Sequence, residues 1–319
     1  MRCLVTGAAG FIGSHLCEAL LTTGYDVVGL DAFIPYYPRP VKVGNLRGLL
    51  AQPRFAFHER DLRTDDLAPV VEGVEVVFHI AAMGGLLASW TDFDVYMTCN
   101  IQATQRLLEA ARRSGRVRQF VHASTSSVYG SYVTGPETTP PRPVSPYGIT
   151  KLAAEHLVRT YDEQFGVPAT ILRFFSVYGP RQRPDMGYYK FIDSLLHGRP
   201  ILIYGDGTQL RGNTYVGDIV RAVLLAHERF RPGTVYNVGG SEEISANQVV
   251  GILQELIGRE AIIQHGPARA GEQQRALADT TLARERLGFT PQVPLREGLR
   301  AQVEWQRMLR DAPPLSVAP

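Results

Sequence analysis

A glycine-rich turn near the amino terminus limits the fold of this chain more than any other feature of the sequence. The apolar run at residues 3–6 leads into the glycine spacing G-x-x-G-x-x-G, which overlaps the start of an amphipathic stretch at 11–21. Glycines between a strand and a helix let the backbone approach a pyrophosphate, and the free N–H groups of the helix N-terminus favour an anion. The pattern predicts the opening of a dinucleotide-binding fold, the alternative being a turn that only allows tight packing. The predicted phosphate-binding residues are Gly7, Gly10, Phe11, Ile12 and Gly13.

Short apolar runs alternate with longer amphipathic stretches through the first half of the chain. Such alternation is typical of an α/β fold with a Rossmann-type, doubly wound parallel sheet. The predicted strands are 3–6, 26–30, 55–58, 74–80, 119–123 and 169–173, and the longest predicted helices are 11–21, 100–111 and 145–161.

The regular alternation of apolar runs and amphipathic stretches ends after about residue 176. Shorter strands are predicted at 201–204, 214–216 and 235–238, and helices at 217–229, 245–257 and 296–308. We therefore expect a dinucleotide-binding domain at 1–175 and a smaller, mixed substrate-binding lobe at 176–319. Segments near 213–238 are expected to return to the first sheet.

Composition excludes several classes of function. The net charge is +2 and no run of basic residues stands out, so nucleic acid and anionic membranes are poor partners. No apolar run reaches the length of a membrane span. The cysteines are Cys3, Cys17 and Cys99, an odd number without C-x-x-C spacing. This predicts reduced thiols in the cytoplasm and no metal site.

Acidic residues after the second and third strands are candidates for contacts with the adenosine half of a dinucleotide. Asp31 ends the second strand, 18 residues after Gly13. A carboxylate there accepts hydrogen bonds from ribose hydroxyls and would repel a 2′-phosphate, which favours NAD over NADP. Asp61 is a candidate for the adenine amine, with a helix N-cap as a close alternative. Lys42 either touches the adenosine side of the cofactor or lies on the surface.

A tyrosine and a lysine share one face of the predicted helix 145–161. Tyr147 and Lys151 stand at i and i+4, and Lys151 is one of only three lysines among 33 basic residues. Tyrosine titrates at a pKa of about 10, and a neighbouring ammonium lowers that value, as the positive nicotinamide ring would. Upstream, Thr125 lies in a hydroxyl cluster that follows a strand. Each feature alone has an ordinary reading, a shared helix face or a Ser/Thr-rich turn, but together they indicate proton transfer at a sugar hydroxyl.

These motifs resemble the extended short-chain dehydrogenase/reductases of the nucleotide-sugar epimerase, dehydratase and decarboxylase group. The resemblance covers essentially the whole chain, and within the group it is greatest to bacterial UDP-glucuronate 4-epimerases. It is carried by T-G-A-A-G-F-I-G-S-H-L at 6–16, F-H-I-A-A at 78–82, S-V-Y-G at 127–130, Y-x-x-x-K at 147–151, R-F-F-S-V-Y-G-P-R at 173–181 and G-P-R-Q-R-P-D-M at 179–186.

The resemblance implies roles for individual residues. Tyr147 would be the base, Lys151 its partner and a ligand of the nicotinamide ribose, and Thr125 the catalytic Ser/Thr. The cofactor is NAD, the substrate a UDP-sugar, and a homodimer through helices 100–111 and 145–161 is expected. Further cofactor contacts are expected at Leu62, Ala81, Ala82 and Asn100. For the substrate, Arg211 and Arg269 would bind the diphosphate, Glu272 the uridine ribose, and Arg183 and Ser176 would face the carboxylate of the sugar.

The hydroxyl cluster also bears on which reaction follows formation of a 4-keto sugar. Dehydratases of the group read Thr-Asp-Glu at this place and UDP-xylose-forming decarboxylases read Thr-Ser-Glu, whereas this chain has Thr125, Ser126 and Ser127. The absence of a carboxylate favours 4-epimerisation. The alternatives are a UDP-glucose or N-acetylated UDP-hexose 4-epimerase, a UDP-glucuronate decarboxylase and a non-catalytic NAD-binding sensor.

A uronate substrate would need a partner for its carboxylate. A 4-keto glucuronate is a β-keto acid that loses CO₂ most readily when its C5–C6 bond stands perpendicular to the ketone plane. Charge-assisted hydrogen bonds from Arg183, with the hydroxyls of Ser126, Ser127 and Ser176, would hold the carboxylate away from that geometry. The alternative is that Arg183 binds phosphate or faces solvent. The chain also departs from its relatives at 83–87, where Leu87 replaces an arginine, and at 212–213, where Gly-Asn replaces Asp-Phe.

Overall fold

A computed structural model describes residues 1–240, 242–268 and 274–311. In this part of the chain the main sheet has seven parallel strands in the order β12-β7-β5-β4-β1-β2-β3. This confirms the Rossmann-type α/β prediction. The strands are β1 (Arg2–Thr6), β2 (Asp26–Asp31), β3 (Phe55–Glu59), β4 (Val76–His79), β5 (Gln119–Thr125), β7 (Ala169–Phe174) and β12 (Thr234–Val238).

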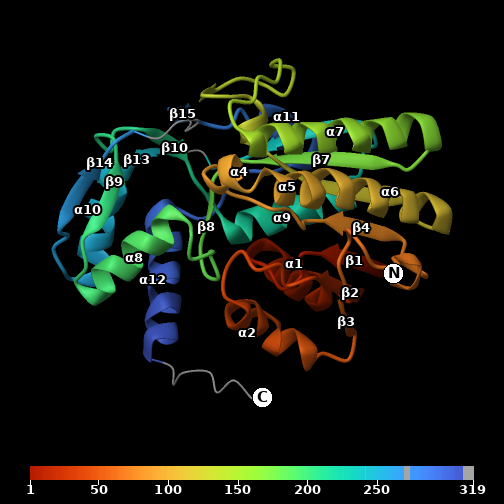
Figure 1. The fold of residues 1–319 in the computed structure, drawn as a ribbon, viewed down its shortest axis with the longest axis horizontal. Helices are drawn as coiled ribbons and strands as arrows, with labels where there is room; N and C mark the ends of the chain where they lie inside the picture. The colour runs from red at the N-terminus through yellow and green to blue at the C-terminus, as the bar shows by residue number, and fades with distance from the viewer. Residues whose placement is uncertain (241, 269–273, 312–319) are drawn as a thin grey trace.

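Helices cover both faces of this sheet because its strands bury side chains on both sides. On β1, Cys3 and Val5 join one core, while Leu4 joins the other. The first core takes in α1 (Phe11–Thr22), α2 (Arg39–Leu50), α9 (Val216–Glu228) and α11 (Thr281–Leu287). The second takes in α3 (Ala68–Val71), α6 (Ala103–Ser114) and α7 (Pro146–Phe165), of which α6 and α7 are prominent in Figure 1.

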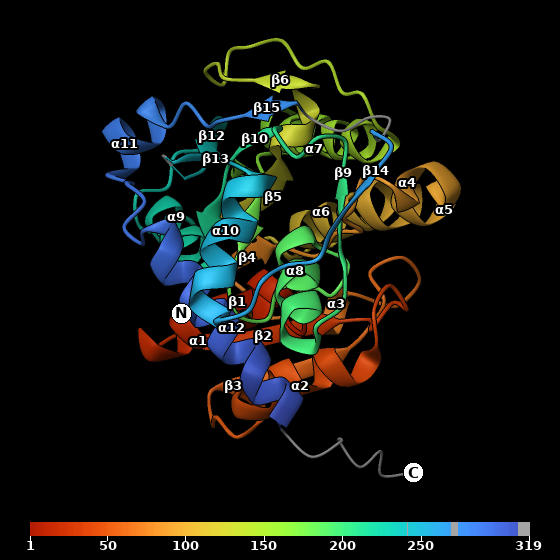
Figure 2. The ribbon, with the colours of Figure 1, turned by 90° about the vertical axis from the view of Figure 1, so that its left-hand side faces the viewer.

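Apart from α9, β12 and α11, the elements that follow β7 form a smaller lobe at one end of the sheet (Figures 1 and 2). A separate apolar core joins α8 (Gly187–His197), α10 (Ala246–Ile257) and α12 (Leu295–Asp311). The short strands here are β8 (Val177–Tyr178), β9 (Ile201–Tyr204), β10 (Leu210–Gly212), β11 (Thr214–Tyr215), β13 (Glu243–Ser245), β14 (Ile263–Gly266) and β15 (Arg275–Ala276), and β15 also pairs with β6 (Tyr132–Val133).

The chain crosses back from the smaller lobe to the main sheet. β12 pairs in parallel with β7 along Thr234–Val238, and α9 packs against α1. The segment of the chain expected to return thus supplies the edge strand of the sheet. The division at residues 175 and 176 stays a prediction.

Several elements differ from the sequence prediction. The helix predicted at 100–111 is preceded by α4 (Ala88–Thr91) and α5 (Phe93–Tyr96), and its first turn belongs to the π-helix η1 (Met97–Gln102). A π-helical turn inserts one residue per turn and is common at functional sites. Helices α2 and α8 and most of the short strands of the smaller lobe were not predicted.

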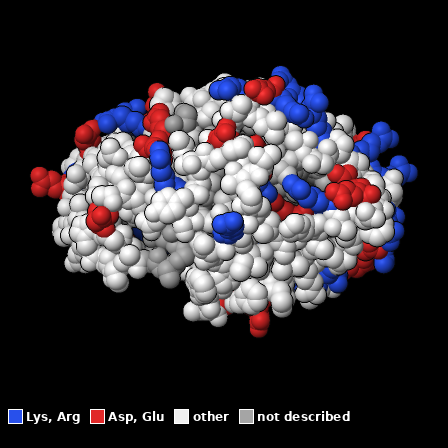
Figure 3. Space-filling model, turned by 90° about the horizontal axis from the view of Figure 1, so that it is seen from above, with Lys and Arg blue, Asp and Glu red and all other residues white. Residues whose placement is uncertain are grey.

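Surface features agree with the modest net charge. On the face drawn in Figure 3, basic and acidic side chains are interspersed and no broad field of one sign forms. Within residues 1–240, 242–268 and 274–311, no helix combines the length and apolar character needed to cross a bilayer. Cys3, Cys17 and Cys99 are all buried free thiols.

Candidate active site

The turn between β1 and α1 has the geometry that a pyrophosphate needs. Gly7 has φ +71°, and a Cβ on Gly13 would overlap the carbonyl oxygen of Gly7 and lie 2.7 Å from its carbonyl carbon. α1 starts after Gly10 with no side-chain cap and no acidic residue in its first turn. Within the turn the N–H groups of Ala8 and Gly10 donate to the carbonyls of Leu30 and Gly7, so the N–H groups of the first turn of α1 are the ones available to an anionic ligand. A Cβ on Gly13 would fill the space in which the backbones of Gly7 and Gly13 approach each other. The turn therefore has the close backbone packing that a bound dinucleotide requires.

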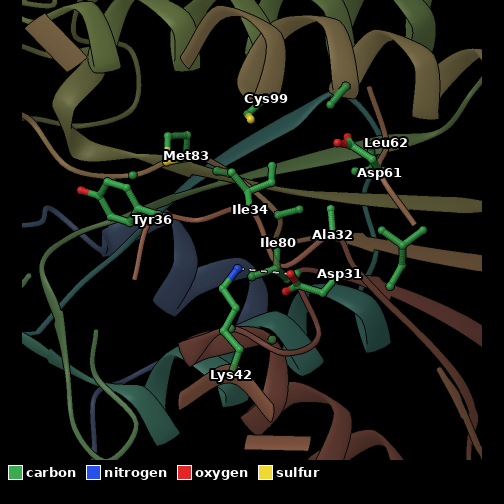
Figure 4. A pocket seen from close by; sticks show the side chains of 18 of the residues that line it. Asp31, Ala32, Ile34, Tyr36, Lys42, Asp61, Leu62, Ile80, Met83 and Cys99 are labelled. Carbon is green, nitrogen blue, oxygen red and sulfur yellow. Dashed lines mark hydrogen bonds and ion pairs between the residues drawn. The ribbon is translucent and has the colours of Figure 1, made fainter. Parts of the chain in front are cut away.

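Asp31 and Lys42 form a buried ion pair at the end of β2 (Figure 4). Lys42 Nζ lies 3.2 Å from Asp31 Oδ1, and the two side chains are 10% and 8% exposed. Asp31 Oδ1 also accepts the backbone N–H of Phe33 at 2.8 Å. Both interactions use the same oxygen and orient the carboxylate, and no hydrogen bond to Oδ2 is found among the described residues. The contact with a ribose hydroxyl stays a prediction. The surface reading of Lys42 is wrong, because α2 carries this lysine inward over Asp31.

One pocket brings together most of the residues predicted to contact the cofactor. In Figure 4, Tyr36 and Met83 lie at one end of it and Asp61 and Leu62 at the other. The predicted residues that line it are Gly7, Gly10, Phe11, Ile12, Gly13, Asp31, Lys42, Asp61, Leu62, Ala81 and Ala82. Sequence reasoning missed Ile34, Tyr36, Tyr37, Arg60, Arg63, Met83, Gly84 and Cys99, which also line it. All of these except Cys99, which lies in η1, come from the loops after β2, β3 and β4, and that place was the signal that could have found them.

Asp61 stabilises a turn after β3. Its carboxylate accepts the backbone N–H of Arg63 at 2.8 Å and pairs with the Arg63 guanidinium at 2.7 Å. The next helix, α3, has Leu67 at its N-cap. The N-cap alternative is therefore wrong. The contact with adenine stays a prediction.

Asn100, another predicted cofactor ligand, is buried behind the pocket. Its amide accepts the Met83 N–H at 2.8 Å and donates to the Met83 carbonyl at 3.0 Å and to Thr150 Oγ1 at 3.0 Å. Asn100 lies in η1, so the π-helical turn aims this side chain at the loop after β4. The amide joins that loop to α7. Its contact with the cofactor stays a prediction.

Tyr147 lies at the start of α7, directly above the end of β5. Ser145 caps the helix by accepting the Gly148 N–H at 3.1 Å. A Cβ on Gly148 would lie 2.6 Å from the carbonyl oxygen of Ser127, so glycine lets α7 approach the hydroxyl cluster. Burial raises the pKa of Tyr147 above its ordinary value, while a hydrogen bond with Thr125 and the charge of Arg183 act to lower it. Thr125 and Tyr147 are thus brought together as predicted.

Lys151 is fully enclosed one turn further along α7. Its Nζ donates to the Ala123 carbonyl at 2.7 Å and lies 3.3 Å from His122 Nε2. Burial lowers the pKa of Lys151 to about 8, partly opposed by the negative charge of Glu155. In the described part of the chain, no hydrogen bond joins Lys151 to the Tyr147 hydroxyl. The groups found to favour the phenolate are therefore Thr125 and Arg183.

A buried polar network fixes the strand ends beneath these side chains. Arg173 donates to Glu155 from Nε at 3.0 Å and from Nη2 at 2.7 Å. Ser124 donates to the same carboxylate at 2.5 Å, and Arg173 Nη1 donates to Tyr129 at 2.7 Å. The network links β5, α7 and β7. It holds the hydroxyl cluster and the Tyr147 helix in one geometry.

Arg183 lies where the cofactor pocket meets the Tyr147 side chain. It lines the pocket, forms an ion pair with Asp185 at 3.0 Å, and acts electrostatically on Tyr147. The reading of Arg183 as a solvent-facing residue is wrong, because its side chain is 24% exposed and paired.

The other predicted substrate residues lie on several different elements. Ser126 and Ser127 are buried in η2 (Ser126–Val128), and Ser176 lies between β7 and β8. Arg211 lies on β10, and its charge lowers the pKa of Tyr188 on α8, which burial raises. Arg269 and Glu272 lie outside the described residues. The contacts of these groups with a substrate stay predictions.

Comparisons with known proteins agree with this geometry. Residues 3–239 match the NAD dependent epimerase/dehydratase family. The Bacillus subtilis protein named "Uncharacterized UDP-glucose epimerase YtcB" is 44% identical over 96% of this chain and 98% of its own length. The UDP-glucuronate 4-epimerase of Thermodesulfobacterium geofontis is 35% identical over 95% of each chain.

A solved structure extends the likeness to the fold. The crystal structure of UDP-glucuronic acid 4-epimerase from Bacillus cereus, in complex with UDP-glucuronic acid and NAD, is 43% identical to this chain. It superposes with a TM-score of 0.94 over 97% of this chain and 100% of that one. This chain therefore belongs to the NAD dependent epimerase/dehydratase family.

Proposed function

We propose that this chain is an NAD-dependent nucleotide-sugar 4-epimerase that interconverts UDP-glucuronate and UDP-galacturonate through a 4-keto sugar. The observation that carries the proposal is the guanidinium of Arg183, held at the end of the cofactor pocket within electrostatic reach of Tyr147. A cation at that place suits a sugar that carries a carboxylate. The B. cereus enzyme, a complex with UDP-glucuronic acid and NAD, supports the same reading.

The cofactor would lie along the pocket that begins at the glycine turn. Gly7, Gly10 and Gly13 would hold the pyrophosphate, and Asp31 the adenosine ribose. When bound, NAD supplies a hydride acceptor for C4 of the sugar and returns the hydride to the other face. Because the Asp31 carboxylate repels a 2′-phosphate, NAD is favoured over NADP.

The residues around C4 of the sugar would transfer the proton of the 4-hydroxyl. Tyr147 takes the proton of the 4-hydroxyl, and Thr125 donates a hydrogen bond that favours the phenolate. Lys151 supplies a buried cation at the end of β5 and a ligand for the nicotinamide ribose. Arg183, assisted by Ser126, Ser127 and Ser176, would hold the sugar carboxylate so that the 4-keto intermediate turns over without losing CO₂.

The smaller lobe would bind the nucleotide half of the substrate. We assign the diphosphate to Arg211 and Arg269 and the uridine ribose to Glu272. The lobe would span residues 176–319 and the cofactor domain 1–175, with β12 and α9 returned to the main sheet. The substrate then lies between the two parts, with its sugar at Tyr147.

Replacing Thr125 with Val should move the acid limb of the kcat/KM profile to higher pH. The Thr125 hydrogen bond lowers the pKa of Tyr147, so its loss raises that pKa and less phenolate forms at neutral pH. A hydrogen bond to a charged group contributes about 1.5–3 kcal/mol, so the limb should move by about one pH unit or more. Rates measured from pH 6 to 10 test this. Thr160→Val is the matched control, because Thr160 is exposed on the same helix and, among the described residues, its hydroxyl is found bonded to the His156 carbonyl alone. An unshifted limb would contradict the role.

Replacing Arg183 with Ala tests the substrate. UDP-glucuronate turnover should fall roughly tenfold to a hundredfold, in line with one charged hydrogen bond of about 1.5–3 kcal/mol. Purified protein is incubated with UDP-glucuronate, UDP-glucose and UDP-N-acetylglucosamine without added cofactor, and products are identified by chromatography. Wild-type protein should yield UDP-galacturonate. UDP-xylose or CO₂ as the main wild-type product, or equal rates for the wild type and Arg183→Ala, would contradict the proposal.

A UDP-glucose 4-epimerase is the second candidate. It is favoured by the name of the 44% identical B. subtilis relative and by Asp185, which already neutralises Arg183. The same panel separates the two, since a neutral-sugar enzyme should prefer UDP-glucose and lose little on replacement of Arg183.

A homodimer and a cytoplasmic location complete the proposal. Exposed apolar side chains gather on α4, α5, η1 and α7, elements that contact one another: Trp90, Phe93, Met97 and Ile149. A second copy would cover this face through α6 and α7. Light scattering tests the dimer, and Trp90→Glu should favour the monomer.

The buried free thiols suit a reducing compartment.

A further inference from the structure

A buried histidine that the proposed chemistry does not use lies against Lys151. His122 is on β5 and is fully enclosed, and its Nε2 lies 3.3 Å from Lys151 Nζ. His79 is its neighbour on β4, with the two ring centroids 5.3 Å apart. Burial and the charge of Lys151 lower the pKa of His79 to about 3 and that of His122 well below its ordinary value. Both rings are therefore neutral at pH 7.

Hydrogen bonds account for both nitrogens of the His79 ring. Thr104 donates its hydroxyl to the Asn100 carbonyl at 2.7 Å, so its oxygen accepts from His79 Nε2, which lies 2.9 Å away. Thr6 accepts the N–H of Ala81 at 3.1 Å and donates to His79 Nδ1 at 2.8 Å. The network thus assigns the ring proton of His79 to Nε2. No nitrogen of His79 is left for a further hydrogen bond.

His122 differs, because only one of its nitrogens has a partner. No hydrogen bond to its Nδ1 is found in the described part of the chain. The ammonium of Lys151 can only donate, so His122 Nε2 accepts and the ring proton lies on Nδ1. A buried N–H without a partner destabilises the folded chain, and an apolar ring of the same size would avoid that cost. What the imidazole adds at this place is an acceptor for Lys151.

Two acceptors on β5 fix the direction of the Lys151 ammonium. The Ala123 carbonyl takes one N–H at 2.7 Å, and His122 Nε2 takes a second at 3.3 Å. An ammonium has three N–H groups, and its rotation about the C–N bond is set once two of them are held. For the third N–H, no protein acceptor is found among residues 1–240, 242–268 and 274–311. This N–H is the one left for the nicotinamide ribose or the Tyr147 oxygen.

We propose that His122 is a positioning residue, which holds Lys151 in its charged form and fixes the direction of the N–H left for the reacting groups. The inference rests on the proposed function and deepens it. His122 acts through Lys151 and touches neither the sugar nor the proton that Tyr147 takes.

The charged and titratable groups around Lys151 come from four elements: Tyr147 and Glu155 one turn before and after it on α7, His122 on β5, His79 on β4 and Arg173 on β7. Glu155 raises the pKa of Lys151 and is itself paired with Arg173 at 2.7 Å. Burial lowers the pKa of Lys151 to about 8, so the ammonium is lost as the pH rises through that value. Without the His122 acceptor the ammonium is less stable, its pKa falls further, and the loss begins at lower pH.

His122→Phe removes the acceptor and keeps an aromatic ring. The alkaline limb of kcat for UDP-glucuronate should move to lower pH by about one pH unit, so turnover at pH 9 should fall roughly tenfold. KM should change by less than about twofold, because Lys151 is assigned no contact with the sugar. A loss of packing alone would lower kcat equally from pH 6 to 10. His227→Phe is the matched control, since His227 is buried at the opposite end of β5 beside Gln119, and its limb should not move.

His122→Gln and His122→Asn separate the acceptor from the volume of the ring. A glutamine side chain reaches as far as Nε2 of histidine, so its amide oxygen can accept from Lys151, whereas asparagine reaches only the Nδ1 position. Glutamine should therefore restore the wild-type limb, and asparagine should behave as phenylalanine does. An unshifted limb in His122→Phe, or equal limbs for the two amides, would overturn the proposal.

If His122→Phe does not fold, as judged by thermal unfolding and NAD content, the wild-type holoenzyme carries the test. In protein labelled with ¹⁵N-histidine, the NMR shifts of the ring nitrogens report which nitrogen bears the proton. We expect Nδ1 for His122 and Nε2 for His79, with the His122 signals identified by their absence from His122→Gln. A proton on His122 Nε2 would overturn the proposal, because that nitrogen could not accept from an ammonium. This measurement needs no substrate, so wild-type inactivity toward UDP-glucuronate would overturn the proposed function alone.

Discussion

Replacing Tyr147 with Phe should reduce UDP-glucuronate turnover by about a hundredfold to ten-thousandfold, the range in which a positioned base contributes. The hydroxyl is the group that hydrogen-bonds with Thr125 and feels the charge of Arg183. Phenylalanine keeps the ring and its edge-to-face contact with Tyr96, whose centroid lies 6.2 Å away. The variant should therefore fold, retain NAD and bind UDP-glucuronate, which makes the loss one of kcat.

Tyr161→Phe provides the control on the same helix. Its hydroxyl bonds with Gln105 at 2.9 Å and Glu109 at 3.4 Å, far along α7 from Thr125. Turnover of this variant should stay near the wild type. Rates from initial velocities, with bound NAD measured after protein denaturation, compare the two. More than a tenth of wild-type activity in Tyr147→Phe would rule out the tyrosine as the base.

The parts of the site that could be predicted from the sequence are local. The glycine turn, Asp31 at a strand end, and Tyr147 one helical turn before Lys151 each depend on neighbours within a few residues. For these, the sequence of one segment determines the local conformation, and the role of each residue stays a prediction. Parallel topology then brings the ends of β1, β2 and β5 to the same edge of the sheet, so their combination into one site was predictable as well.

The parts that could not be predicted depend on contacts between distant segments. The sequence left Lys42 open between a cofactor contact and a surface position, because α2 contains a proline and two glycines, which weaken its helical signal. The helix forms because Leu46 and Leu49 are buried in the same core as α1, and this packing turns Lys42 onto Asp31. The surroundings of Arg183 likewise join loops after β2, β4 and β8, through Tyr36, Gly84 and Asp185, and none of these loops alone indicates the contact.

The glycine turn provides the second large expected effect. Gly13→Ala should weaken the binding of NAD, because the added Cβ meets the backbone of Gly7, which cannot move aside as a flexible side chain can. The strain must push α1 away from β1 or distort the turn, and either change misdirects the N–H groups intended for the pyrophosphate. Overpacking of this kind costs about 1–3 kcal/mol or more, so NAD affinity should fall at least tenfold and the melting temperature by several degrees.

Gly48→Ala is the matched comparison, since Gly48 is exposed in α2 and has no atom within 4 Å of its Cβ position. Gly48 lies in the last turn of α2, where alanine should hold or raise stability, by up to about 1 kcal/mol. NAD content of the purified proteins, thermal unfolding with and without added NAD, and UDP-glucuronate turnover distinguish the two variants. If Gly13→Ala kept full NAD occupancy, the turn would serve only to pack helix on strand, and the pyrophosphate would have to bind elsewhere in the pocket. If excess NAD restored turnover, the strain would act on affinity alone, and the geometry around Tyr147 would be independent of the turn.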